Sequence, residues 1–202
     1  QAKATFFVLG RAANQKPEVV RKIKERGHEV ASHGFNHKLI YSLSQEEFKS
    51  DLEKSVKILE DIAGEKVLGF RAPSWSLNQK TSWVYPVLAE LGFKYSASVF
   101  PIKTSLYGLP DAPRFPYLVK TESGKVLEIP TSTLRMFGRN IPFSGGAYFR
   151  IAPRCLVAYG IKKIKNPSMR GKKMEMERKS IKIFNNNQFL FPFNHIRFHK
   201  IC

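Results

Sequence analysis

The sequence predicts an α/β fold in which parallel strands alternate with covering helices. Short β-branched and aromatic runs alternate with amphipathic segments through residues 1–150, and a glycine ends each of the first three predicted helices. The chain has 202 residues, of which 43% are apolar and 12% aromatic, enough for one domain with a full core. Either a barrel or a doubly wound sheet would satisfy this alternation.

The first strand is expected at residues 5–8, where Thr-Phe-Phe-Val is typical of a buried strand. It follows Gln1 almost at once, without an initiator Met, so we expect that sequence has been lost upstream. Pro17 then begins a helix that ends at Gly27 and carries an apolar face made of Val19, Val20 and Ile23. A second strand is expected at residues 28–32.

The next helix has the clearest local signal in the chain. Ser44 and Glu47 form a capping box, Leu43 and Phe48 are placed as a hydrophobic staple, and Gly64 supplies the stop. Its apolar face is Phe48, Leu52, Val56, Leu59 and Ala63. A third strand is expected at residues 67–70.

The following helix is expected within residues 83–91, where Pro86 should kink it or restrict it to its later part. Gly92 ends it, and a fourth strand is expected at residues 93–99. Residues 101–116, rich in Pro, Gly and Tyr, predict a long loop over the mouth of the sheet, and residues 126–129 predict another strand. After Gly160 no clean period is visible.

The net charge of +18 is unevenly distributed. Residues 151–202 carry 12 basic and 2 acidic residues and so hold more than half of the excess. This charge raises nucleic acid as a partner, but that hypothesis rests on charge alone, and we expect no nucleic-acid partner. Two cysteines are too few for a disulfide scaffold, and no apolar run is long enough to span a bilayer. No secretion signal is visible, so the compartment stays open between bacterial cytoplasm and cell envelope.

Two histidines follow directly on the second predicted strand, at the carboxyl edge where α/β folds build their sites. If the segment from His33 to His37 turns as a helix, both imidazoles can bind one divalent ion, although such pairs also occur on solvated surfaces. A third ligand is not obvious. Glu29 could point away, and the helix carboxylates Asp51, Glu53 and Glu60 are expected to be solvated charges.

The third predicted strand leads into Arg71, Ser74 and Trp75. The arginine could orient a carboxylate or contact substrate, and the tryptophan could stack on a sugar ring. The alternative is an arginine in a structural ion pair and a tryptophan packed in the core.

These segments resemble the NodB-homology polysaccharide deacetylases, which are carbohydrate esterase 4-like. His33-Gly34-Phe35-Asn36-His37 resembles their H-x-x-x-H metal motif, and Arg71-Ala72-Pro73-Ser74 resembles their R-x-P motif. The subgroup associated with bacterial exopolysaccharide and exosortase loci is resembled more narrowly by residues 4–10, 27–29, 93–101, 107–116 and 145–150. The similarity covers nearly all of residues 2–160.

The resemblance implies a distorted (β/α) barrel, here incomplete, that binds zinc or another divalent ion through Asp-His-His and deacetylates N-acetylated sugars. His33 and His37 would be metal ligands, and Arg71 would hold the catalytic base in place. The backbone of Ser74 would stabilise the oxyanion, while Trp75 and Tyr148 would contact the polysaccharide.

The chain departs from the family pattern in three places. The motif that supplies the aspartate base and ligand would lie upstream of residue 5, Ser96 stands where the subgroup has an aspartate, and no H-P-W-E segment is recognisable around His195 or His199. We therefore divide the chain into a partial deacetylase domain, residues 1–160, and a divergent basic segment, residues 161–202. The isolated chain is expected to be weak or inactive. A non-catalytic carbohydrate-binding module, with Trp75, Tyr107 and Tyr148 stacking on sugars, is the alternative.

Overall fold

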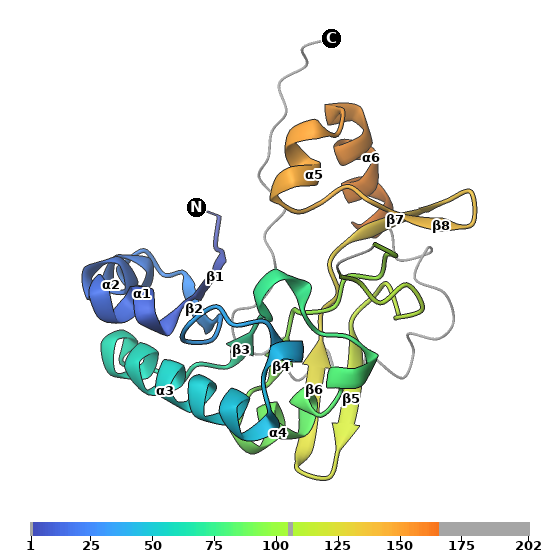
Figure 1. Cartoon of the computed structure of the whole chain (residues 1–202). Coiled ribbons are helices and arrows are strands. Elements are labelled where there is room, and N and C mark those ends of the chain that lie inside the picture. The colour runs from blue at the N-terminus through green and yellow to red at the C-terminus, as the bar shows by residue number, and fades with distance from the viewer. Residues whose placement is uncertain (1, 105–106, 166–202) are drawn as a thin grey trace.

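The computed structural model describes residues 2–104 and 107–165, and these residues form an α/β structure built on a six-stranded sheet with the strand order β1-β2-β3-β4-β6-β5 (Figure 1). The strands are β1 (Thr5–Val8), β2 (Glu29–Ser32), β3 (Gly69–Phe70), β4 (Tyr95–Ser96), β5 (Tyr117–Thr121) and β6 (Gly124–Glu128). β1, β2, β3, β4 and β6 run parallel, and β5 is antiparallel to β6. Parallel strands separated by helices confirm the predicted fold class.

The helices that follow the strands are α1 (Gly10–Gln15), α2 (Pro17–Glu25), α3 (Gln45–Ala63) and α4 (Val84–Glu90), with short 3₁₀ turns at Ile40–Ser42, Pro73–Trp75 and Gln79–Thr81. The capping box at the start of α3 is confirmed, since Ser44 and Glu47 each accept the other's backbone N–H, and Gly64 ends the helix at φ 69°. Pro86 lies in the first turn of α4, where its missing N–H breaks no helical bond, so the helix begins two residues before the proline and is not restricted to its later part.

The core lies between the sheet and the helices that cover it. Phe70 of β3 meets Phe48 of α3 edge to face, with ring centroids 5.6 Å apart, and both side chains are buried. Gly69 is needed at its place in β3 because the ring of Tyr95 lies where a Cβ atom would stand. The predicted apolar faces hold α2 and α3 to the core, with one correction: Val20 and Ile23 of α2 are buried, whereas Val19, which we expected on the same face, is 50% exposed.

The chain beyond the sheet forms the hairpin β7 (Thr133–Met136) and β8 (Arg139–Pro142), followed by α5 (Gly146–Ile151) and α6 (Arg154–Lys165). Figure 1 shows these elements beyond the end of the sheet. The sequence did not predict these elements, nor did it predict α1 and β5. The boundary expected at residue 160 lies within α6, and residues 166–202 lie outside the described residues.

The described residues form an open sheet rather than a closed barrel, with β1 and β5 at its edges. Since β1 to β4 are parallel, their carboxyl ends meet at one edge, where the loops that carry the predicted site begin. No helix in the described part of the chain is long and apolar enough to cross a bilayer.

Candidate functional site

His33 and His37 lie on the loop that leaves β2. The N–H of His33 donates to the carbonyl of Val8 and extends the β1–β2 pairing by one residue. The segment does not turn as a helix, because Gly34 (φ 78°) and His37 (φ 58°) adopt the left-handed conformation. This turn brings the two imidazole rings to a centroid distance of 5.1 Å with an interplanar angle of 69°.

The ring of His33 is oriented by the backbone. Its Nδ1 lies 2.7 Å from the carbonyl oxygen of Arg71, and a carbonyl can only accept, so Nδ1 carries the proton and Nε2 keeps its lone pair. Burial lowers the pKa of His33, which favours the neutral imidazole. A neutral ring held through Nδ1, with Nε2 free, is the form in which histidine binds metal ions.

The spacing of the rings fits one shared ion. Two imidazoles that bind a single tetrahedral ion through one nitrogen each, at about 2.0–2.1 Å, have centroids about 5 Å apart. The observed separation of 5.1 Å agrees with this value. Within residues 2–104 and 107–165, no group of three or more His, Cys, Asp or Glu side chains is placed to hold a metal ion. These two histidines thus form an incomplete donor set.

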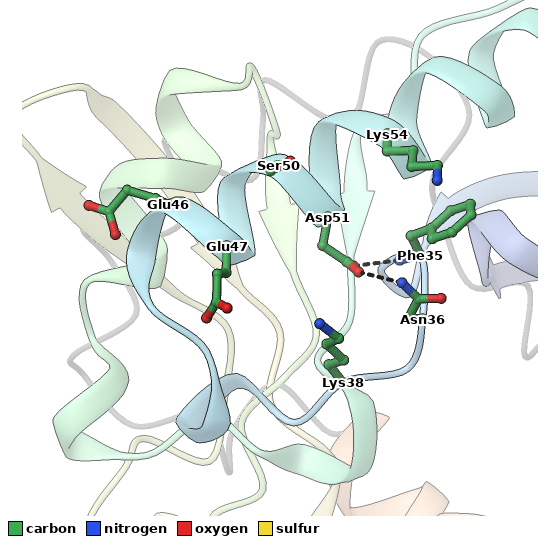
Figure 2. A pocket seen from close by; sticks show the side chains of 8 residues that line it. All are labelled: Phe35, Asn36, Lys38, Glu46, Glu47, Ser50, Asp51 and Lys54. Atoms are coloured by element: carbon green, nitrogen blue, oxygen red, sulfur yellow. Dashed lines mark hydrogen bonds between the residues drawn. The ribbon is translucent and has the colours of Figure 1, made fainter.

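Helix α3 fixes this histidine loop from one side. The carboxylate of Asp51 accepts the backbone N–H of Phe35 at 2.7 Å and the side-chain amide of Asn36 at 3.4 Å, as Figure 2 shows. The hydroxyl of Ser55 donates to the carbonyl of Gly34. Asp51 is therefore not the solvated charge that we expected: it anchors the segment between the two histidines.

Phe35, Asn36 and Asp51 also border an open depression with a volume of about 440 Å³ (Figure 2). It is lined by Phe35, Asn36, Lys38, Glu46, Glu47, Ser50, Asp51 and Lys54. Its walls carry both signs of charge, so it shows no preference for an anionic or a cationic ligand.

Arg71 follows β3 and lies beside the histidines. Its Nε–H donates to the carbonyl of Ala97 at 3.1 Å, and its guanidinium carbon lies 4.0 Å from the centroid of the Phe7 ring. Burial lowers the pKa of Arg71. Its carbonyl holds His33, so the arginine and the histidine loop form one unit.

Ser74 and Trp75 both adopt left-handed backbone conformations, each with a φ of 50°. Such residues cost energy and occur where the surrounding structure holds them, often at functional sites. Ser74 is exposed on this turn, and the indole N–H of Trp75 donates to the hydroxyl of Thr131 at 3.0 Å. The turn therefore carries an exposed serine beside a fixed tryptophan.

Four aromatic rings, Trp75, Phe100, Tyr107 and Tyr148, form what we call the aromatic cluster. The Trp75 ring centroid lies 5.2 Å from that of Phe100 and 5.5 Å from that of Tyr107, and Tyr107 stacks on Phe100 at 6.1 Å. Tyr148 meets Phe100 edge to face at 5.8 Å. The structure thus brings the predicted residues Trp75 and Tyr148 together around Phe100, which sequence reasoning missed.

The hydroxyls of Tyr107 and Tyr148 lie 3.3 Å apart, and this hydrogen bond is the main cause that raises the pKa of Tyr148 to about 12. Glu29 lies outside the site, since its carboxylate accepts hydroxyl hydrogens from Thr5 and Tyr95 at the start of β2. The late histidines His195 and His199 lie outside the described residues.

Two family models match separate parts of the chain. Residues 1–96 match the family model for polysaccharide deacetylase, and residues 97–172 match that of a domain of unknown function (DUF3473). Residues 1–96 are therefore part of a polysaccharide deacetylase domain. The resemblance predicted from the sequence is confirmed over these residues.

Curated relatives carry the same kind of name. The chain is 31% identical over 96 residues to a peptidoglycan deacetylase of Helicobacter pylori, a match that covers 48% of this chain and 32% of the relative. It is 37% identical over 78 residues to a chitooligosaccharide deacetylase of Azorhizobium caulinodans, covering 37% of each protein. The matched region thus spans about a third of these relatives.

A solved structure supports the fold. A polysaccharide deacetylase from Mycobacterium smegmatis superimposes with a TM-score of 0.56 and 25% identity, covering 79% of this chain and 56% of that one. The parallel sheet and its helices thus share the fold of that structure over 79% of this chain.

Proposed function

We propose that this chain is part of a metal-dependent hydrolase that removes N-acetyl groups from a polysaccharide. One observation carries the proposal. The ring centroids of His33 and His37 lie 5.1 Å apart after the end of β2, and the carbonyl of Arg71 orients the ring of His33. The names of the relatives favour an acetylated amino-sugar polymer as substrate. The match of residues 97–172 is consistent with the exopolysaccharide-associated subgroup.

In this reaction His33 and His37 would hold a divalent ion, and zinc suits two imidazoles. The ion would supply Lewis acidity and a water of lowered pKa. Arg71 would keep a positive charge beside the site and hold the catalytic base in place, while the backbone N–H of Ser74 would donate to the oxyanion of the tetrahedral intermediate. Trp75 and Tyr148, half-buried in the aromatic cluster, would contact the sugar.

Two histidines without a carboxylate ligand should bind metal weakly, so we expect low activity from these 202 residues alone. The division into a deacetylase part, residues 1–160, and a basic segment, residues 161–202, stays a prediction.

The experiment is a cobalt(II) titration of the full chain, followed by visible absorption, with zinc(II) as competitor. We expect a saturable spectrum that is lost in His33→Ala and in His37→Ala. His28→Asn is the matched control, because His28 precedes β2 and lies outside the pair. Acetate release from chitooligosaccharides is measured in parallel. A cobalt spectrum unaffected by either alanine variant would refute the proposed metal site.

The aromatic cluster supports a second candidate, a carbohydrate-binding module without catalysis. Its four rings come from the turn at Pro73–Trp75, the connection between β4 and β5, and α5, and they include neither of the two histidines. Oligosaccharide binding that survives EDTA and is lost in Trp75→Ala, with no acetate release at any metal concentration, would favour this function over the enzyme.

A further inference from the structure

Glu128, at the end of β6, is a fully buried carboxylate that the proposed reaction does not use. Its Oε1 accepts the backbone N–H groups of Ser98 at 2.8 Å and Val99 at 2.9 Å, and its Oε2 accepts the hydroxyl of Tyr85 at 3.0 Å. Burial raises the pKa of Glu128, and these donors oppose that rise. A buried charge needs such partners, and here two of them belong to one loop.

That loop, residues 97–99, leaves β4 and reaches the catalytic side of β3. The carbonyl of Ala97 accepts the Nε–H of Arg71 at 3.1 Å, and the hydroxyl of Ser98 accepts the backbone N–H of Ala72 at 2.9 Å. The position of the Arg71 guanidinium therefore depends on the carbonyl of Ala97, and Glu128 binds the next two residues, Ser98 and Val99.

A second branch of the same network leads to the aromatic cluster. The carbonyl of Val99 accepts the backbone N–H of Thr131 at 2.8 Å, and the hydroxyl of Thr131 accepts the indole N–H of Trp75 at 3.0 Å. Phe100, the next residue of the loop, packs against Trp75. One carboxylate is thus linked to both halves of the candidate site.

We propose that Glu128 is a positioning residue of the deacetylase site, which fixes residues 97–99 so that Arg71 and Trp75 hold their places. The inference rests on the proposed function in one respect, namely that the site is a deacetylase site. The hydrogen-bond network of Glu128 is independent of that function.

The test follows the Nε–H signal of Arg71 and the indole N–H signal of Trp75 by ¹⁵N NMR on the full chain. Arg71→Lys and Trp75→Phe assign the two signals by their loss. In Glu128→Ala the loop loses both acceptor contacts, and we expect solvent exchange of the Arg71 Nε–H to rise about tenfold or more. The Trp75 indole signal should shift in the same variant.

Glu128→Gln keeps an oxygen that can accept both N–H groups but loses the charge. It should rescue part of the effect, with exchange of the Arg71 Nε–H still raised about threefold, because charge-assisted bonds are roughly twice as strong as neutral ones. If Glu128→Ala does not fold, this variant carries the test alone. Glu60→Ala is the matched control, since Glu60 accepts the backbone N–H of Val67 at 3.0 Å, before β3 and away from the site.

Unchanged Arg71 and Trp75 signals in the folded Glu128 variants would overturn the inference, as would equal changes in Glu60→Ala. Binding of chitooligosaccharides is then measured on the same variants, and we expect it to weaken about tenfold in Glu128→Ala. If the wild-type chain neither binds these sugars nor releases acetate, the proposed function fails while the NMR result still decides the role of Glu128.

Discussion

Replacing Asp51 with alanine should loosen the histidine loop without touching either histidine. The carboxylate accepts the N–H of Phe35 at 2.7 Å, and a hydrogen bond to a charged partner contributes about 1.5–3 kcal/mol. Since Asp51 is only half-buried, water can replace part of this contact, which favours the lower end. Alanine is the better helix former by about 0.5 kcal/mol, so we expect a net loss near 1 kcal/mol.

The measurement is urea unfolding followed by circular dichroism, together with thermal melting. For a domain of this size, a loss of about 1 kcal/mol corresponds to a melting temperature lowered by about 2–4 °C. Glu53→Ala is the matched control, because Glu53 is exposed on the same helix, and it should stay within about 0.5 kcal/mol of the wild type. Asp51→Asn, which keeps one acceptor oxygen, should fall between the two.

The same variant also tests the link from helix to site. If Asp51 holds the turn that brings His33 and His37 together, cobalt(II) should bind Asp51→Ala more weakly than Glu53→Ala. Equal stability of the two alanine variants would refute the anchoring role. Lower stability with unchanged metal affinity would show that the histidines find their spacing without help from α3.

Three further outcomes are expected. Gly10→Ala should lose about 1–3 kcal/mol in urea unfolding, because its Cβ would stand 2.8 Å from the Phe35 ring, whereas Gly146→Ala meets nothing within 4 Å and should be neutral. Burial raises the pKa of Glu29, so the folded chain binds the carboxyl proton more tightly than the unfolded chain does. The free energy of unfolding of the wild type should therefore fall relative to that of Glu29→Gln as the pH rises from about 4. Trp75→Phe removes an indole N–H bond and should cost about 1 kcal/mol in urea unfolding.

The sequence predicts the parts of the fold whose signals are local. The capping box of α3 and the glycine at its end are local contacts, and the structure reproduces them. The hairpin β7–β8 was missed, because its turn is Phe137-Gly138, with a φ of 49° at the phenylalanine, and bulky residues rarely adopt this conformation. α1 was missed because Gly10–Gln15 is short and has no capping side chain.

In the candidate site, too, the local motifs could be predicted and the distant contacts could not. Its motifs stand in the sequence, and parallel strands bring their exits to one edge, so the neighbourhood of His33 and Arg71 could be predicted. The residues that hold those motifs could not, because Asp51, Thr131 and Glu128 reach them from other elements. Nothing in the local sequence of a helix carboxylate shows that it will accept a loop N–H 16 residues away.

The position of the Arg71 guanidinium depends on residues 97–99, because its Nε–H donates to the carbonyl of Ala97. Glu128 in turn fixes these residues by accepting the backbone N–H groups of Ser98 and Val99. A wholly buried carboxylate is expensive unless its bonds are complete, so the loop and the carboxylate stabilise each other. A substitution at Glu128 should therefore alter the site as strongly as one in the Arg71 motif, although Glu128 lies 57 residues further along the chain.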